Sequence, residues 1–352
     1  MSEKNKKFTT DKAARTFLEK NKRILEIEPT VAAILDGEKV ALSQTITLLE
    51  SQNEMHWQRG QAILDKIPAP AQTAKCIGIT GSPGVGKSSF IEQLGLMLAN
   101  LDFKVAVLAI DPSSQVSQGS ILGDKTRMES LSNHPKAFIR PSAAGKTLGG
   151  VAQTTKSTIA LCEKAGYQVI LVETVGVGQS EVLVHAMTDM MLLLLQPGSG
   201  DELQGIKKGV VELADLLVVN KYDSDKKDLA KQTQRYFSNA VHMLSPLHSD
   251  WQVKVLLSSA MEKIGLEEVW DNITKFFNAK ESSGQLVSRR MHQSAQWYDT
   301  YLEKIILTTI LENPKINSII QNQKNQIKSG ETTLFQAVEI LKKSLHQRLN
   351  DK

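Results

Sequence analysis

The sequence has few cysteines and no long apolar run, and each absence excludes a class of protein. Its two cysteines, Cys76 and Cys162, stand far apart in apolar surroundings, without the spacing of a metal site. No run of about 18 apolar residues is present, so no membrane-spanning helix is expected. We therefore expect both thiols to be reduced core residues of a cytoplasmic protein that makes no membrane contact.

A strong excess of one charge is also lacking. The chain has 42 Lys+Arg and 38 Asp+Glu, a net charge of +4, which is too mild and dispersed to indicate a nucleic-acid partner. The N-terminus is rich in lysine, but Glu3, Asp11 and Glu19 interrupt it and no apolar segment follows, which argues against a targeting peptide. A length of 352 residues predicts one large domain with appendages, or two domains.

Between residues 75 and 280, short apolar strands alternate with helical patterns. This alternation predicts an α/β fold, with a mostly parallel sheet covered by helices on both faces. Ligands of such sheets bind at the carboxyl ends of the strands, so the polar residues there are the candidates for a site. The expected strands are 75–80, 104–110, 137–139, 169–173, 190–195, 216–220 and 254–257.

The two flanking segments read as helical. Residues 1–74 are broken at Asp36-Gly37 and end in a Pro68-Ala69-Pro70 linker, and we interpret them as a packing appendage. Residues 281–352 are expected to form an arm with one long helix over 286–312 and two shorter ones over 315–328 and 333–349. The apolar faces of the arm need a covering surface, either the sheet domain or a second subunit.

The motif around which the chain is organised is G-S-P-G-V-G-K-S, a P-loop of the form G-x-x-x-x-G-K-S, between the first strand and a helix. Its backbone N–H groups and the helix N-terminus suit phosphate oxygens. We expect Lys87 to reach the β- and γ-phosphates and Ser88 to bind Mg²⁺. The predicted nucleotide contacts of this segment are Gly81, Ser82, Pro83, Gly84, Val85, Gly86, Lys87, Ser88 and Ser89.

The sixth strand ends in N-K-Y-D, which indicates that the base is guanine. The Asp223 carboxylate suits the N1–H and exocyclic amino donors of guanine, whereas adenine leaves it unpaired. Asn220 and Lys221 complete the N-K-x-D motif, and Lys221 is expected along the base. After the seventh strand, Ser259, Ala260 and Met261 are expected to place a backbone N–H at guanine O6. The predicted ligands are GTP or GDP.

Acidic residues after the second and fourth strands are candidates for the metal and for catalysis. Asp111 is predicted to hold Mg²⁺, unless it only forms a turn before Pro112. Glu173 begins E-T-V-G, in which Glu173 approaches the Mg²⁺ shell through a water and the Gly176 N–H meets the γ-phosphate. Gln179 is a candidate for orienting the attacking water, although a loop glutamine is more often only solvated.

Two loops have the composition of moving switches. In the first, Asp124 is a candidate for the metal and Arg127 for the phosphates. In the second, Asp201 and Lys207 pair with each other or with a partner protein. The alternatives are solvated loop charges in the first loop and a helix cap by Asp201 in the second.

Several longer segments resemble the MeaB/ArgK family of P-loop GTPases over almost the whole chain. The matching stretches include V-E-T-V-G-V-G-Q-S-E and P-G-S-G-D-E-L-Q-G-I-K-K-G, which are more specific than the general GTPase motifs. Glu173 in place of the usual aspartate is a feature of the family. Two departures are Ala143-Ala144-Gly145-Lys146, where more serine is expected, and Tyr222, where a small residue is commoner.

The resemblance implies a homodimeric GTPase whose C-terminal arm forms the dimer. We expect slow intrinsic hydrolysis, because the sequence shows no obvious arginine finger or water-positioning glutamine. It implies a chaperone of adenosylcobalamin-dependent acyl-CoA mutases, chiefly methylmalonyl-CoA mutase, that gates cofactor loading and protects the mutase. It also implies that Asp111, Asp124 and Glu173 are Mg²⁺ and switch acids, and that the Asp201–Lys207 loop responds to the mutase.

Two other functions are alternatives to a mutase chaperone. An arginine- or ornithine-transport ATPase or kinase fits an older family label, but N-K-x-D argues against adenine and no kinase catalytic loop is present. A nickel- or cobalt-inserting GTPase typically carries a Cys/His cluster, and neither cysteine here has a nearby co-ligand.

Overall fold

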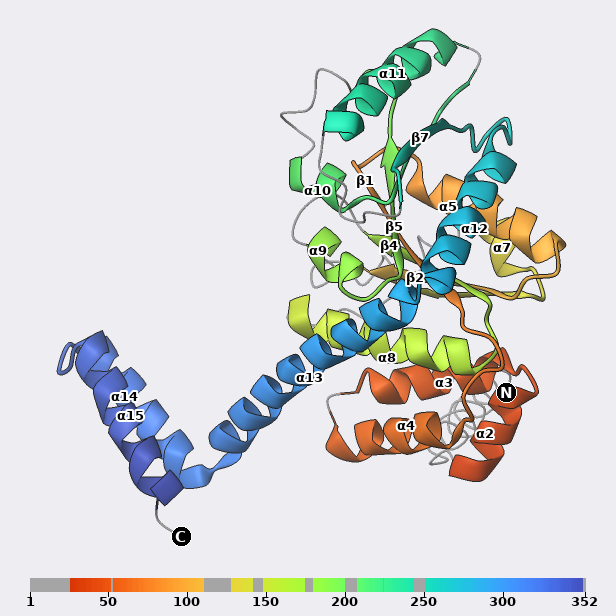
Figure 1. The fold of residues 1–352 in the computed structure, drawn as a ribbon. Coiled ribbons are helices and arrows are strands. Elements are labelled where there is room, and N and C mark those ends of the chain that lie inside the picture. Colours follow the sequence, from red (N-terminus) through yellow and green to blue (C-terminus); the bar gives the residue numbers. More distant parts are fainter. Residues whose placement is uncertain are drawn as a thin grey trace, which may run out of the picture. The chain divides into compact units, whose positions relative to one another are not determined.

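The computed structural model describes residues 26–51, 53–110, 128–141, 148–174, 180–199, 208–223, 225–243 and 251–350 (Figure 1). The chain divides into two compact units, the first ending at Leu286 and the second beginning at Val287.

A seven-stranded sheet forms the centre of the first unit. Its order is β3-β2-β4-β1-β5-β6-β7, and every pairing is parallel. The strands are β1 (Lys75–Gly81), β2 (Val105–Ile110), β3 (Ala137–Pro141), β4 (Val169–Thr174), β5 (Met190–Leu195), β6 (Leu216–Val219) and β7 (Lys254–Leu257). The predicted fold class is confirmed. The third strand is longer than expected because Arg140 and Pro141 still pair with β2, and β3 is an edge strand, where proline is tolerated.

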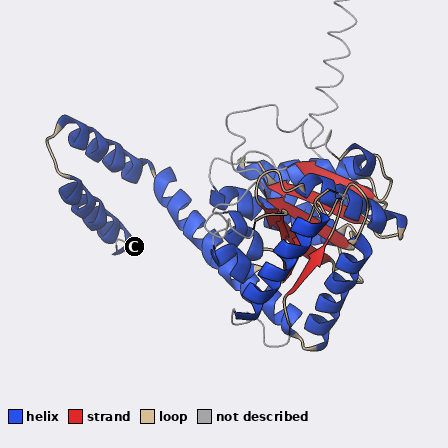
Figure 2. Ribbon diagram, turned by 90° about the horizontal axis from the view of Figure 1, so that it is seen from above, coloured by secondary structure: helices blue, strands red, loops and turns tan. Residues whose placement is uncertain are grey.

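Helices cover both faces of the sheet, because successive side chains of each strand point to opposite faces. In β5, Leu192 and Leu194 join one buried cluster, and Leu193 and Leu195 join another. The first cluster includes residues of α5 (Lys87–Asn100) and α12 (Leu266–Ser282), and α7 (Glu129–Ser132) packs beside α5. On the other side lie α8 (Leu148–Lys164), α9 (Ser180–His185), α10 (Lys208–Leu213) and α11 (Lys227–Met243) (Figure 1). Figure 2 shows helices on both sides of the strands.

The leading helices form a further layer outside α8. They are α2 (Ile27–Leu35), α3 (Lys39–Leu49) and α4 (Glu54–Lys66), and both α3 and α4 contact α8 (Figure 1). The expected break is present, since α2 ends before Asp36 and Gly37 has a φ of 87°. Asn53 caps α4 by accepting a hydrogen bond from the His56 backbone N–H. Residues 1–25 lie outside the described part.

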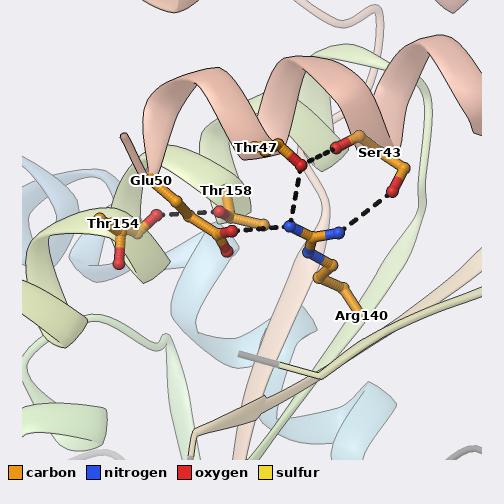
Figure 3. Close-up of polar contacts among 6 residues, drawn as sticks. All are labelled: Ser43, Thr47, Glu50, Arg140, Thr154 and Thr158. Carbon is orange, nitrogen blue, oxygen red and sulfur yellow. Dashed lines mark hydrogen bonds and ion pairs between the residues drawn. The ribbon is translucent and has the colours of Figure 1, made fainter. Parts of the chain in front are cut away.

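A polar cluster around Arg140 joins this layer to the edge of the sheet (Figure 3). The guanidinium donates to Ser43 Oγ at 3.1 Å and to Thr47 Oγ1 at 3.2 Å, two residues one turn apart on α3. It also pairs with the Glu50 carboxylate at 2.6 Å. The side chains of Arg140 and Glu50 are only 21% and 11% exposed, so the pair is partly desolvated and worth more than a surface ion pair. The predicted appendage is thus tied to the carboxyl end of β3.

The second unit contains most of α13 (Gln285–Glu312), together with α14 (Pro314–Ser329) and α15 (Leu334–Asn350). Asn313 accepts hydrogen bonds from the Lys315 and Ile316 N–H groups, and Gly330 ends α14 with a φ of 79°. These features place the breaks where the sequence predicts them. Large apolar side chains remain exposed on α13 and α15 in the single chain, among them Ile305, Ile306, Leu307, Leu334, Phe335 and Val338. No described helix is long and apolar enough to cross a membrane.

Candidate functional site

The site begins at the loop between β1 and α5, where two glycines are required by close contacts. Gly81 has a φ of 154°, and a Cβ there would lie 2.6 Å from the Leu194 carbonyl oxygen. Gly86 has a φ of 93°, and its Cβ would lie 2.8 Å from Asn220 Nδ2. Any side chain at either position forces the loop outward. The loop therefore has the strained, close-packed backbone that a phosphate cradle needs.

Lys87, the first residue of α5, folds back over this loop. Its Nζ donates to the carbonyl oxygens of Gly81 at 2.9 Å and Ser82 at 3.3 Å. Burial lowers the pKa of Lys87, and the Glu173 and Glu181 carboxylates act against that shift. The ammonium is therefore held inside the loop by neutral carbonyls, which a triphosphate would replace with charged oxygens.

Ser88 and Glu173 meet across the gap between α5 and β4. The Ser88 hydroxyl donates to Glu173 Oε1 at 3.0 Å, and Glu173 is 6% exposed. A hydroxyl and a carboxylate at this spacing are the oxygen donors that Mg²⁺ takes in nucleotide sites. The residues present therefore fit a magnesium ion at this point.

The N-K-x-D loop after β6 is bound directly to the phosphate loop. Asn220 Nδ2 donates to the Val85 carbonyl at 2.9 Å, and Lys221 Nζ donates to the Gly84 carbonyl at 2.6 Å. Asn220 is buried, and Lys221 has a φ of 59°, a strained value for a non-glycine residue that is typical of functional loops. The structure thus connects the segments predicted for base and phosphate.

Asp223 is positioned by the loop after β7. The Ser259 hydroxyl donates to Asp223 Oδ1 at 2.5 Å and accepts from the Glu262 backbone N–H at 2.9 Å. Ser259 is fully buried and Ala260 nearly so, whereas Met261 is exposed. The carboxylate is therefore oriented before any base arrives, which strengthens discrimination between bases.

Tyr222, the unusual residue of the motif, has a local role. The Lys227 Nζ lies 5.6 Å from the centre of its ring, and the same Nζ lies 3.7 Å from a Glu262 carboxylate oxygen. Lys227 thereby links the loop after β6, which contains Asp223, to the loop after β7.

Several predicted site residues lie outside the described part of the chain: Asp111, Asp124, Arg127, Gly176, Gln179, Asp201 and Lys207. Of the predicted nucleotide contacts, Pro83 and Ser89 are exposed, and Ser82 is half-buried. Sequence reasoning overlooked Glu181, a buried acid whose charge acts on Lys87. Its position in the G-Q-S-E end of the fourth-strand motif was the available signal.

Comparisons with known proteins show the family of the chain. Residues 42–315 match a family model described as methylmalonyl Co-A mutase-associated GTPase MeaB. The chain belongs to the MeaB family. Its P-loop, its N-K-x-D loop and its parallel sheet are therefore those of a GTPase that binds guanine nucleotides.

Individual MeaB-family relatives span nearly the whole chain. A "Putative GTPase" of Caulobacter vibrioides is 42% identical over 317 residues, covering 90% of this chain and 97% of its own. The "Methylmalonic aciduria type A homolog, mitochondrial" of Caenorhabditis elegans is 41% identical, covering 90% and 82%. A crystal structure described as an LAO/AO transport system kinase is 33% identical with a TM-score of 0.70, covering 91% and 97%. The likeness therefore extends beyond the sheet into the leading helices and the C-terminal helices.

Proposed function

We propose that this GTPase is a chaperone of an adenosylcobalamin-dependent acyl-CoA mutase, with methylmalonyl-CoA mutase as the expected partner. It gates loading of the cofactor and protects the loaded mutase from inactivation. The observation that carries the proposal is the match over residues 42–315 to a family described by its association with that mutase. The match extends beyond the expected GTPase domain (75–280) at both ends, into segments that nucleotide binding alone does not require.

The reaction is in-line attack of water on the γ-phosphate of GTP, in which positioning and charge provide most of the catalysis. The Lys87 ammonium moves from the Gly81 and Ser82 carbonyls to the β- and γ-phosphate oxygens, where it stabilises developing negative charge. Asp223, oriented by Ser259, selects guanine. A bound Mg²⁺ supplies further neutralisation of the phosphate oxygens.

We assign the metal to Ser88 and Glu173, whose side-chain oxygens are already 3.0 Å apart. Asp111 and Asp124 complete the proposed metal and switch acids, and Gly176 the γ-phosphate contact. Arg127, Gln179, Asp201 and Lys207 are proposed switch residues. Because no water-positioning group stands among the described residues around Lys87, we expect slow intrinsic hydrolysis that rises when the mutase orders the switches.

We also propose that the C-terminal arm, residues 281–352, forms a homodimer. The exposed apolar residues of α13 and α15 support this proposal, because such faces are stabilised when a second surface covers them. Light scattering of the full chain should give twice the mass of one subunit. A double variant, Phe335→Asp with Val338→Asp, should give a folded monomer, whereas a dimer that survives both charges would place the interface elsewhere.

The chaperone role is tested by cofactor loading. Apo-mutase is mixed with adenosylcobalamin and this protein, with GTP or with a non-hydrolysable GTP analogue, and loading is followed by cobalamin absorbance. We expect the extent or rate of loading to depend on which nucleotide is present, and the Lys87→Met variant to remove that dependence. Loading that is indifferent to protein and nucleotide would contradict the proposal.

One structural relative is described as a transport system kinase, which leaves transport-linked phosphorylation as the second candidate. The Asp223–Ser259 arrangement argues against it, because a half-buried, oriented carboxylate that adenine leaves unpaired penalises that base. ATP hydrolysis as fast as GTP hydrolysis would favour this second candidate.

A further inference from the structure

Two buried threonines connect β1, which leads into the phosphate loop, with β4, which carries Glu173. Thr80 is the residue before Gly81, and Thr174 is the residue after Glu173. The Thr174 hydroxyl donates to Thr80 Oγ1 at 2.9 Å and lies 3.4 Å from the Ile79 carbonyl oxygen. Both side chains are fully buried, so this hydrogen bond is shielded from competition by water.

The pair lies where the backbone connection between β1 and β4 ends. The last paired residues of these strands are Ile79 and Glu173. Beyond them β1 continues along β5, with Gly81 paired to Leu194. The threonine pair therefore extends the link between β1 and β4 by one residue, on the side where the phosphate loop begins.

We propose that Thr80 and Thr174 are positioning residues for GTP hydrolysis that hold Glu173 at the correct distance from Ser88. Neither threonine contacts the nucleotide in this proposal, and each acts through its neighbour in the chain. The inference rests on the proposed assignment of Mg²⁺ to Ser88 and Glu173. It predicts that losing the pair weakens the use of Mg²⁺ while leaving metal-free nucleotide binding intact, because Gly81 and Lys87 are held by β5 and by the loop itself.

The structure makes the two threonines unequal. Thr174→Val removes the donor of the pair and leaves the buried Thr80 hydroxyl without its partner. Thr80→Val removes only the acceptor, and the Thr174 hydroxyl keeps the Ile79 carbonyl within reach. Thr174→Ser keeps the hydroxyl. We therefore expect the Thr174→Val effect to be the larger one and Thr174→Ser to restore wild-type behaviour.

The experiment measures kcat, KM for GTP and the Mg²⁺ concentration at half-maximal rate, together with GDP affinity in EDTA. For Thr174→Val we expect half-maximal Mg²⁺ to rise about fivefold, from the loss of one buried hydrogen bond, with GDP affinity in EDTA unchanged. The double valine variant lacks the same link but leaves no buried hydroxyl unpaired, so its loss should be no larger than that of Thr174→Val. Thr45→Val, a buried threonine in α3 that donates to its own helix, is the matched control and should leave the Mg²⁺ response unchanged.

The outcomes separate the inference from the assignment beneath it. A wild-type rate that does not need Mg²⁺ would overturn the metal assignment, and this inference with it. A Mg²⁺-dependent wild type whose Thr174→Val variant loses only thermal stability would overturn the positioning role alone. Equal losses in Mg²⁺ response and in metal-free GDP binding would also overturn it, because the pair would then only support the fold.

Discussion

The guanine-binding residues allow a quantitative prediction for Asp223→Asn. In the structure Asp223 Oδ1 is engaged by the Ser259 hydroxyl at 2.5 Å, and an asparagine keeps that bond through its amide oxygen. Its NH₂ group then faces the exocyclic amino donor of guanine, so the hydrogen bond there is lost, and the N1–H group is left with a neutral instead of a charged acceptor. A loss of about 1.5–3 kcal/mol for the first bond and about 1 kcal/mol for the second should lower the GTP affinity by a factor on the order of 10² to 10³.

The same geometry predicts what the variant gains. Xanthine carries an oxygen in place of the exocyclic amino group of guanine, so the asparagine NH₂ of the variant has an acceptor there. Competition against a fluorescent nucleotide should show xanthosine triphosphate binding the variant better than GTP, with ATP weak throughout. Thermal unfolding serves as the control for folding. A folded Asp223→Asn protein that keeps the wild-type preference for GTP would refute the base assignment.

Three further predictions concern stability and reactivity. Arg140→Met should lower the free energy of unfolding, measured by urea titration, by about 2–3 kcal/mol, because it leaves the partly buried Glu50 carboxylate without its ion-pair partner. Lys66→Met, which breaks the exposed Lys66–Glu28 pair, is the control and should cost much less. Equal losses in the two variants would contradict this prediction. Burial raises the pKa of the Cys162 thiol to about 12, so a thiol reagent at pH 8 should modify it only after unfolding; rapid modification of the folded protein would refute its burial. Because burial lowers the pKa of Lys87, the unfolded state binds more protons between that lowered value and the ordinary lysine value of 10.5. The nucleotide-free wild type should therefore gain stability relative to Lys87→Met as the pH rises towards 10.5, and a constant difference between the two would contradict the shift.

The local part of the fold was predictable because it depends on neighbouring residues. Apolar runs of three to seven residues placed all seven strands, with ends that differ by at most two residues. Asn313-Pro314 and Gly330 marked helix ends for reasons that act within one turn. The order of strands in the sheet did not follow from these patterns, because it depends on which apolar faces pack together.

In the candidate site, too, local motifs were predictable from the sequence and tertiary contacts were not. The sequence identified Lys87 and Asp223 because both belong to motifs with fixed spacing. It did not identify the long-range contacts around the site. The Ser259 hydroxyl meets Asp223 from a different strand end, 36 residues along the chain, and Thr174 meets Thr80 across 94 residues. Such pairs need a tertiary structure, because nothing in the local sequence connects residues so far apart.

The leading helices gave the weakest signal. Their apolar faces indicate packing but not a target, and the sequence offers no reason to connect Glu50 with Arg140. The ion pair forms because α8 holds α3 beside the carboxyl end of β3. This layer is therefore part of the GTPase structure, as the extent of the family match also indicates.

The most direct test measures the rate of GTP hydrolysis, with ATP hydrolysis as the control. Each rate is measured in the presence and in the absence of a purified adenosylcobalamin-dependent methylmalonyl-CoA mutase from the same cell. The account predicts a slow GTP-specific rate that rises when the mutase is added, and no rate in Lys87→Met. A GTP-specific rate that does not respond to the mutase would contradict the assigned partner, and an ATP rate equal to the GTP rate would contradict the base assignment as well.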